Sequence, residues 1–285
     1  MIARRLLATA ATSCLTGFVC GGGAFAADLP PAPDVHVDIS GSPLPAVSGL
    51  NAKVDAFGGA YNEGGIAGGG IAVSIPLGFR YGTQIDGLAA SLDDELLLSI
   101  SDHLFWRDPS RGLLGLYGSY AHYEGFGGID EWRIAAEAEL YWDHFTLRGI
   151  AGIEGGDADR QVTPAGIANY EIDTRFYDKV DAAFYPVPDL QLFVGHRYIG
   201  GIHALGLGGE YLWRSDGGTA TATFAEGRIG QEGNHAVWAG LRFYFGREEK
   251  SLMRRHREDD PALWEPDTHL GTSHPLADTP AIPVL

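Results

Sequence analysis

The chain has 285 residues, a formal net charge of −17 and 41 glycines. Beyond the first 26 residues it has no run of 18 or more apolar residues, which excludes a helical membrane anchor of the usual length. The negative charge argues against nucleic acid as a partner, because the phosphate backbone binds basic surfaces.

The first 26 residues have the pattern of a secretory signal peptide. Arg4 and Arg5 form its basic region, residues 6–19 its apolar region and residues 24–26 (AFA) its cleavage site. Cys14 and Cys20 both lie in this segment, so the predicted mature chain has no thiol for a disulfide, a metal site or a nucleophile. It keeps 18 basic and 37 acidic residues, a net charge of −19, which would favour cations in a pore, although charge placement matters more than the sum.

Residues 27–49 are rich in proline and predict an extended linker without a core of its own. The linker lies in the periplasm under one hypothesis and folds back as a plug under the other, and composition favours the first.

Residues 130–154 (DEWRIAAEAELYWDHFTLRGIAGIE) carry the clearest structural signal. Two segments of about ten residues alternate between an apolar and a charged face and meet at a tight turn, Asp143-His144. About 9 to 11 residues is the length that a tilted strand needs to cross hydrocarbon. The apolar face bears no charge and has Trp132 and Trp142 near its ends, where interfacial aromatic residues belong. This favours a transmembrane β-hairpin over a soluble one, which would also alternate.

Strand-like segments continue through residues 50–246. Turns rich in Pro, Gly and Asp alternate with longer loops, as in barrels with both ends in the periplasm, and the longest loop is 155–169. Gly200-Gly201 is short for an outer loop, so ten or fourteen strands are alternatives. Asp102 suggests a bulge or a register shift in the fourth segment. The predicted fold is all-β, a transmembrane antiparallel up-and-down β-barrel of about 12 strands. Its segments are 50–61, 66–75, 79–88, 95–106, 112–123, 131–142, 144–154, 170–185, 190–199, 201–213, 219–229 and 235–245.

The last of these segments, Ala236–Gly246 (AVWAGLRFYFG), resembles the closing strand of Gram-negative outer-membrane barrels, which alternates and ends in aromatic residues. Residues 27–30 (ADLP) look like the mature start of alphaproteobacterial porin-family barrels. The resemblance implies insertion into the outer membrane by the barrel-assembly machinery, contact with lipid and lipopolysaccharide, and periplasmic termini. It transfers no functional residue, and the forty or so residues after the aromatic end depart from the pattern.

Those residues, 247–285, begin with mixed charge and end rich in proline. They predict a solvated periplasmic tail with a short helix around residues 248–257. Contact of the basic run 253–257 with anionic lipid or a partner is the alternative.

The expected inward face holds charges of both signs, which need counter-charges or water inside a closed barrel. One hypothesis is a narrow water-filled channel for ions or small solutes, and the other is a barrel closed by its own paired charges, with a structural or surface role. The candidate lumen residues are Arg133, Glu137, Glu139, Arg148, Asp173, Arg175, Lys179, Asp181, Glu210, Glu226 and Arg228. The predicted interfacial aromatic residues are Trp132, Trp142, Phe243 and Phe245.

A barrel hydrolase is the third hypothesis, and the sequence disfavours it. Ser119 and His122 have opposite strand parity, and the chain has no G-x-S-x-G motif. The ten histidines form no metal motif, so neither a metal nor a cofactor is expected. Paired carboxylates occur at Glu137/Glu139 and Asp173/Asp181, but such pairs are common on charged strands. The oligomeric state is left open.

Overall fold

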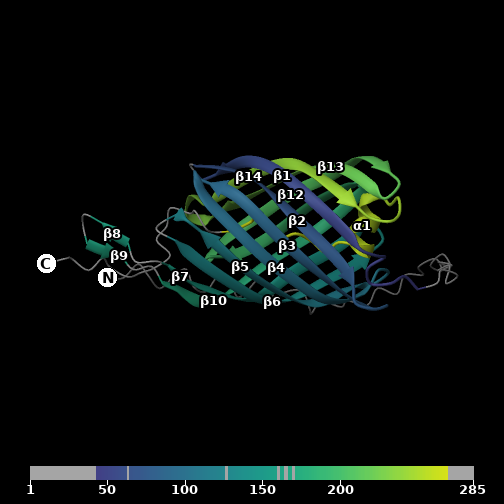
Figure 1. Ribbon diagram of the computed structural model, residues 1–285, viewed down its shortest axis with the longest axis horizontal. Helices are drawn as coiled ribbons and strands as arrows, with labels where there is room; N and C mark the ends of the chain where they lie inside the picture. The colour runs from purple at the N-terminus through teal and green to yellow at the C-terminus, as the bar shows by residue number, and fades with distance from the viewer. Residues whose placement is uncertain are drawn as a thin grey trace, which may run out of the picture. The chain divides into compact units, whose positions relative to one another are not determined.

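The computed structural model describes residues 43–62, 64–125, 128–158, 161–163, 166–168 and 171–268. Twelve antiparallel strands form a closed barrel, in which the last strand pairs with the first (Figure 1). The predicted up-and-down transmembrane barrel of 12 strands is confirmed. Its strands are β1 (Asn51–Tyr61), β2 (Gly64–Pro76), β3 (Tyr81–Leu92), β4 (Glu95–Asp108), β5 (Gly112–Tyr123), β6 (Ile129–Trp142), β7 (Phe145–Ala158), β10 (Glu171–Val187), β11 (Leu190–Ile199), β12 (Ile202–Asp216), β13 (Thr219–Gly230) and β14 (His235–Phe245).

Two short strands, β8 (Gln161–Thr163) and β9 (Gly166–Ala168), form a separate hairpin in the connection between β7 and β10. The sequence predicts a single long loop there, residues 155–169. β7 and several other strands extend a few residues beyond their predicted ends. A strand continues as long as it has a hydrogen-bonded partner, even where the alternation of apolar residues has stopped.

The barrel has two different ends. The end where β1 starts and β14 stops also holds the turns between β2 and β3, β4 and β5, β6 and β7, β10 and β11, and β12 and β13, and is called the turn end here. The opposite end is the loop end. The connection at Gly200-Gly201 belongs to the loop end and is a two-residue turn, with φ of 62° and 77°. Glycine adopts these left-handed angles without strain, which allows the short connection there.

The bulge predicted at Asp102 is wrong. The pairing of β4 with β3 and with β5 is continuous, and the Asp102 carboxylate lies on the outer surface, where it accepts a hydrogen bond from Thr83 Oγ1 at 2.9 Å. A neighbouring hydroxyl therefore satisfies the polar group without a change of register. Register shifts occur instead where β10 pairs with β7 and β11, and where β12 pairs with β13.

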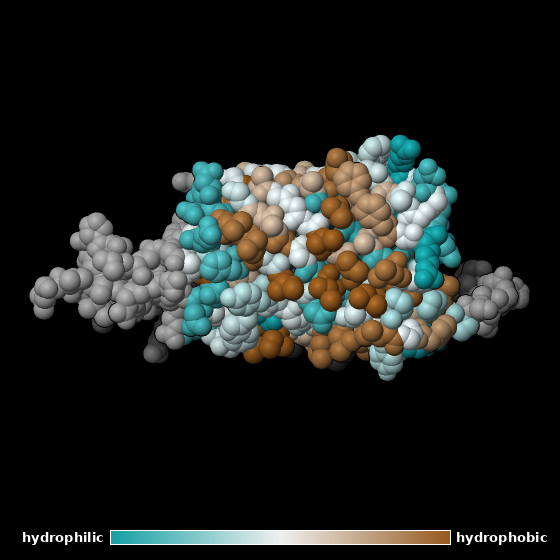
Figure 2. Space-filling view, viewed as in Figure 1, coloured by the Kyte–Doolittle hydropathy of each residue, from teal (hydrophilic) through white to brown (hydrophobic). Residues whose placement is uncertain are grey.

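The outer face of the barrel is apolar. On β6 the side chains from Ile134 to Trp142 alternate between exposed and buried: the exposed ones are all apolar, and the buried ones include Glu137, Glu139 and Tyr141. In the face shown in Figure 2, hydrophobic residues gather over the middle of the barrel and hydrophilic ones at its two ends. Such a band is the surface that a lipid bilayer covers. Within the described ranges, no helix has the length and apolar character needed to span a membrane.

The interior is divided into an apolar and a charged region. Inward side chains at the loop end of β1 to β6, β13 and β14 form one apolar cluster, which includes Phe57, Leu97 and Trp238. The remaining interior is lined mainly by buried charged side chains.

Part of the predicted linker belongs to the barrel. Ala46 N donates to Phe79 O at 2.8 Å, and Val47 packs with Phe105 and Leu113 at the turn end. These residues are part of a core because the strand ends leave an apolar pocket that Val47 fills. Residues 1–42, which include the predicted signal peptide and most of the linker, lie outside the described residues.

Candidate functional site: a lumen occupied by the C-terminal segment

The chain after β14 turns back into the barrel. Its helix, α1 (Leu252–Glu258), lies where the sequence analysis places a short helix, but most side chains between residues 250 and 268 are buried. The expected solvated tail is therefore wrong for the described part, because the charges of this segment find partners inside the barrel. Residues 269–285 lie outside the described residues. Figure 1 shows α1 at the turn end and the chain beyond it running inside the barrel.

Helix α1 closes the turn end. The Ser251 hydroxyl caps the helix by accepting a hydrogen bond from Arg254 N, and Leu252 packs with inward apolar residues of β12, β13 and β14. Leu252 N donates to the Asp189 carboxylate in the turn between β10 and β11 at 3.1 Å. The helix is thus fixed to several strand ends.

A buried lysine ties the two termini of the barrel domain together. Lys250 Nζ donates to both carboxylate oxygens of Asp259, at 2.8 and 2.9 Å, and to Ser48 Oγ at 2.8 Å. Ser48 N in turn donates to Glu258 O at 3.2 Å. The residues that precede β1 and those that follow α1 therefore hold each other at the turn end.

Residues 259–268, called the plug here, enter the lumen from this point. Ser74 Oγ donates to Asp260 Oδ1 at 3.0 Å, and Lys53 Nζ donates to Pro261 O at 2.8 Å. Trp264 packs among buried inward side chains, which include Tyr117 and Tyr177, and its Nε1 lies 3.4 Å from a Glu137 oxygen.

The far part of the plug makes ion pairs with the wall. Glu265 Oε1 lies 2.8 Å from Arg133 Nη1. The two oxygens of Asp267 lie 2.6 Å from Arg197 Nε and 2.6 Å from Arg228 Nη1. These are charge-assisted hydrogen bonds, the stronger class in proteins.

The plug runs along most of the lumen. Lys53, which it meets first, is near the start of β1 at the turn end, whereas Arg228 is near the end of β13 at the loop end. Two cavities beside the plug have volumes of about 30 and 20 Å³, which is room for a water molecule or two each. The described chain therefore holds the lumen closed along this path.

The wall also pairs charges with itself. Arg242 bonds both Asp55, at 2.8 and 2.7 Å, and Glu210, at 2.6 Å. His103 lies between two carboxylates, with Nδ1 2.9 Å from Glu137 and Nε2 3.0 Å from Asp86. Both ring nitrogens are occupied, so His103 has no free nitrogen with which to act as a general base.

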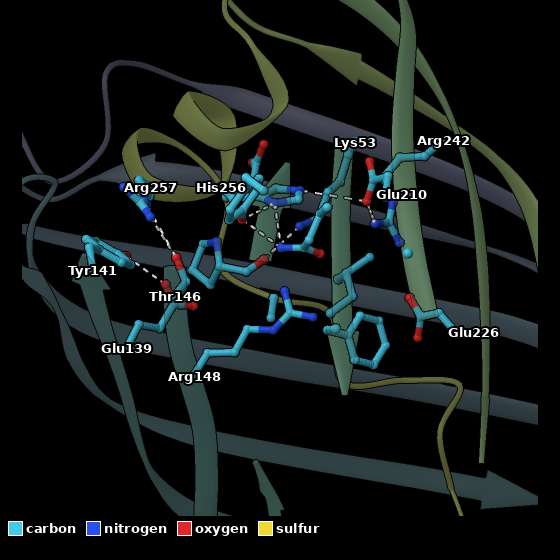
Figure 3. A pocket seen from close by; sticks show the side chains of 18 residues that line it. Lys53, Glu139, Tyr141, Thr146, Arg148, Glu210, Glu226, Arg242, His256 and Arg257 are labelled. Atoms are coloured by element: carbon cyan, nitrogen blue, oxygen red, sulfur yellow. Dashed lines mark hydrogen bonds and ion pairs between the residues drawn. The ribbon is translucent and has the colours of Figure 1, made fainter. Parts of the chain in front are cut away.

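Figure 3 shows the cavity between α1 and the wall, with His256 pointing toward Glu210. The ring nitrogens of His256 lie 2.9 Å from the Tyr185 hydroxyl and 3.2 Å from the Tyr244 hydroxyl, and Nε2 is 3.7 Å from Glu210. Burial lowers the pKa of His256 to about 4 even though Glu210 opposes this, so the ring is neutral at pH 7. The charged groups that act on it are Glu210, Arg148 and Lys53.

The structure brings most of the candidate lumen residues together. Asp173 is the exception: it lies in the irregular stretch of β10 between Ile172 and Arg175 and is exposed. Arg175 is half-buried near the loop end, where it stands opposite the buried Glu154, so it keeps the inward parity, and its Nε donates to Asp173 O at 3.4 Å. Arg133, Glu137, Glu139, Lys179, Asp181, Glu210 and Arg228 are buried inside the barrel, and Arg148 and Glu226 are half-buried beside the cavity of Figure 3.

Among the predicted interfacial aromatic residues, Trp142, Phe243 and Phe245 are exposed on the outer face toward the turn end. Trp132 is half-buried and lies nearer the loop end. Their contact with a membrane interface stays a prediction.

Sequence reasoning missed the residues that fill the lumen, above all Trp264, Glu265 and Asp267. One signal could have found them: four acidic residues and a tryptophan stand together at residues 259–267 without an intervening base. Such a segment complements a basic wall, but the sequence does not show that the wall is within its reach.

In the carboxylate pairs Glu137/Glu139 and Asp173/Asp181, three of the four carboxylates already bond other side chains. Glu137 bonds His103, Glu139 accepts from the Tyr141 hydroxyl at 2.6 Å, and Asp181 pairs with two arginines. In the described part of the chain, no group of three or more side chains is arranged to hold a metal ion.

Comparison with known proteins gives neither a matching family model nor a matching curated protein. Solved structures with a similar fold include an outer-membrane channel from Pseudomonas putida F1, with 10% identity over 72% of this chain and 96% of that chain and a TM-score of 0.47. The KdgM porin has 7% identity over 67% and 98% and a TM-score of 0.44. The translocator domain of the autotransporter NalP from Neisseria meningitidis has 14% identity over 74% and 90% and a TM-score of 0.43.

Proposed function

We propose that the protein is an outer-membrane channel for ions or small solutes whose narrow lumen is closed by its own C-terminal segment. The observation that carries this proposal is the course of the plug, which follows the charged side of the lumen from the turn end toward the loop end through ion pairs and hydrogen bonds.

The polarity of these contacts favours a removable plug. If the plug leaves, water enters the lumen and hydrates Arg133, Arg197 and Arg228. These side chains then exchange the carboxylates of the plug for water molecules as hydrogen-bond partners. An apolar interface would instead expose hydrocarbon to water. The apolar cluster around Trp238, by contrast, is made by side chains of the strands themselves.

The outer face supports the location. A continuous apolar band around a closed barrel suits a lipid environment, and the closing strand resembles those inserted by the barrel-assembly machinery. Contact with lipopolysaccharide and periplasmic termini belong to the same proposal. Fractionation with outer membranes, and a gel mobility that changes on heating, test it; a soluble periplasmic protein with unchanged mobility would contradict it.

Planar-bilayer recording of the refolded full-length chain tests conduction. The variant Asp260→Asn/Glu265→Gln keeps the length of the plug but removes two of its charges. Breaking a buried charge pair costs about 3–5 kcal/mol, and about 1.4 kcal/mol is a factor of ten. We therefore expect rare openings in the unsubstituted protein and at least tenfold more in the variant.

Asp178→Asn is the matched control, because Asp178 is a half-buried carboxylate on β10 that pairs with His196 at the outer surface and does not touch the plug. It should conduct as rarely as the unsubstituted chain. If neither the unsubstituted protein nor the plug variant shows discrete conductance steps, the channel is refuted and the barrel has a structural or surface role.

A further inference from the structure

Two buried arginines bond one carboxylate of the plug, and a buried lysine bonds the main chain beside it. Arg197 and Arg228 each bond one oxygen of Asp267 at 2.6 Å. Lys179 Nζ donates to the main-chain carbonyl of Trp264 at 2.7 Å and to that of Asp267. The exposed fractions of Lys179, Arg197 and Arg228 are 0%, 4% and 1%.

The wall compensates these charges only in part. Arg197 shares Asp181 with Arg148, at 2.6 and 3.2 Å. Arg228 bonds the neutral groups of Asn234, at 3.1 Å, and Tyr61, and among the described residues Asp267 is the only carboxylate paired with it. Glu226 is the other wall carboxylate nearby. Arg148, Arg197 and Arg228 thus share two wall acids, and the plug supplies the missing negative charge.

We propose that Lys179, Arg197 and Arg228 form a carboxylate-binding site of the lumen, that Asp267 occupies this site in the closed barrel, and that an organic dicarboxylate takes the place of the plug. Two guanidinium groups, one on each oxygen, hold a carboxylate in a defined orientation. The site lies near the loop end, at the ends of β11 and β13.

A second base sets the preference for two carboxylates. Arg133 bonds Glu265, two residues before Asp267 in the plug, at 2.8 Å, besides the wall carboxylates of Glu131 and Glu154 at 3.1 and 3.2 Å. Because Glu265 and Asp267 stand two residues apart, their α-carbons lie at most about 7 Å from each other. A short linear dicarboxylate has a similar reach, and adipate, with four methylene groups between its carboxylates, is the probe.

The transport role of this site rests on the proposed function, but binding requires only that the plug leaves. Adipate binding is measured by titration calorimetry on the refolded full-length chain in detergent. A tethered competitor acts at an effective concentration in the millimolar range, so the unsubstituted protein should bind adipate weakly. Asp267→Asn should bind it at least tenfold more tightly, and Asp267→Asn/Arg228→Gln should lose that gain.

Asp178→Asn serves again as control and should match the unsubstituted protein. 1,4-Diaminobutane, a dication of similar length, should not bind to any of these proteins. Heat-dependent gel mobility confirms that each variant is folded, and Asp267→Ser replaces Asp267→Asn if the latter does not fold. Equal adipate affinity in the unsubstituted and Asp267-substituted proteins, or a gain that survives Arg228→Gln, would overturn the site.

The outcome is separable from that of the channel test. Adipate binding to Asp267→Asn without conductance in any variant would keep the site and reject the channel. Conductance of Asp260→Asn/Glu265→Gln without tighter adipate binding by Asp267→Asn would keep the channel and reject the site.

Discussion

The charge of the plug makes its release dependent on the sign of the membrane potential. The plug contains four carboxyl groups, Asp259, Asp260, Glu265 and Asp267, and no Lys or Arg. Because α1 and β14 hold the plug at the turn end, it can leave only toward that end. A potential that is positive on the turn-end side therefore favours opening, and the opposite sign favours closure.

The size of this effect follows from the distance that the charges travel. One charge moved across the full potential changes the free energy by about 2.3 kcal/mol per 100 mV. Asp267 and Glu265 cross most of the lumen, whereas Asp259 and Asp260 start near the turn end. If the four charges cross half of the potential on average, the bias is about 4–5 kcal/mol per 100 mV.

The assay is planar-bilayer recording at +100 and −100 mV on a chain that starts at Ala27 and so lacks Cys14 and Cys20. A thiol label at Ser110→Cys, in the turn between β4 and β5, determines the orientation. We expect openings at one sign only. Glu265→Gln/Asp267→Asn removes the two charges that travel furthest and should reduce the asymmetry by more than half. Equal opening at both signs, or an asymmetry that this variant leaves unchanged, would refute the motion of the plug.

Three further predictions concern the wall and the helix. Ala138→Arg places a charge on the exposed outer face, which should cost about 2–4 kcal/mol of barrel stability in the membrane and abolish the heat-dependent gel shift of the folded barrel. Glu139→Gln, on the inner face, should still assemble. Equal effects of the two substitutions would mean that the outer and inner faces are exchanged. The lowered pKa of His256 means that the docked helix binds fewer protons than the free one, so docking is fully stable above pH 6.5 and weakens as the pH falls toward 4. By pH 5 the loss is about 2 kcal/mol, so opening should increase between pH 7 and 5, and His256→Gln should flatten that rise; an unchanged profile would contradict it. Gly152→Val should prevent pairing of β6 with β7, because a Cβ at Gly152 would lie 2.0 Å from Ile134 O, whereas Gly58→Ala, whose Cβ would meet nothing closer than 3.8 Å, should show a normal gel shift.

Local residue chemistry was enough to predict the barrel wall. A transmembrane strand must be apolar on the lipid side, and its side chains alternate, so residues 131–154 reveal both faces and the turn between them. The three segments 112–123, 190–199 and 235–245 have the predicted bounds, because turn residues flank them directly. The alternation failed at Asp173, which lies in the irregular stretch of β10 between Ile172 and Arg175 and is exposed.

The plug could not be derived in this way. Residues 259–268 have no strand or helix period, and their charges have the composition of a solvated tail. Only the closed barrel brings Arg133, Arg197 and Arg228, from three distant strands, around Glu265 and Asp267.

The same holds for the charge of the lumen. The net charge of −17 for the whole chain favours cations in any pore, whereas the site around Asp267 has more bases than acids on its wall. The sequence by itself determined the barrel. Each strand has lipid on one side and the lumen on the other, so its side chains alternate between apolar and polar, and this alternation is visible in the sequence. The tertiary structure alone decided what fills the barrel, since Coulomb interactions depend on distances between strands that sequence separation does not record.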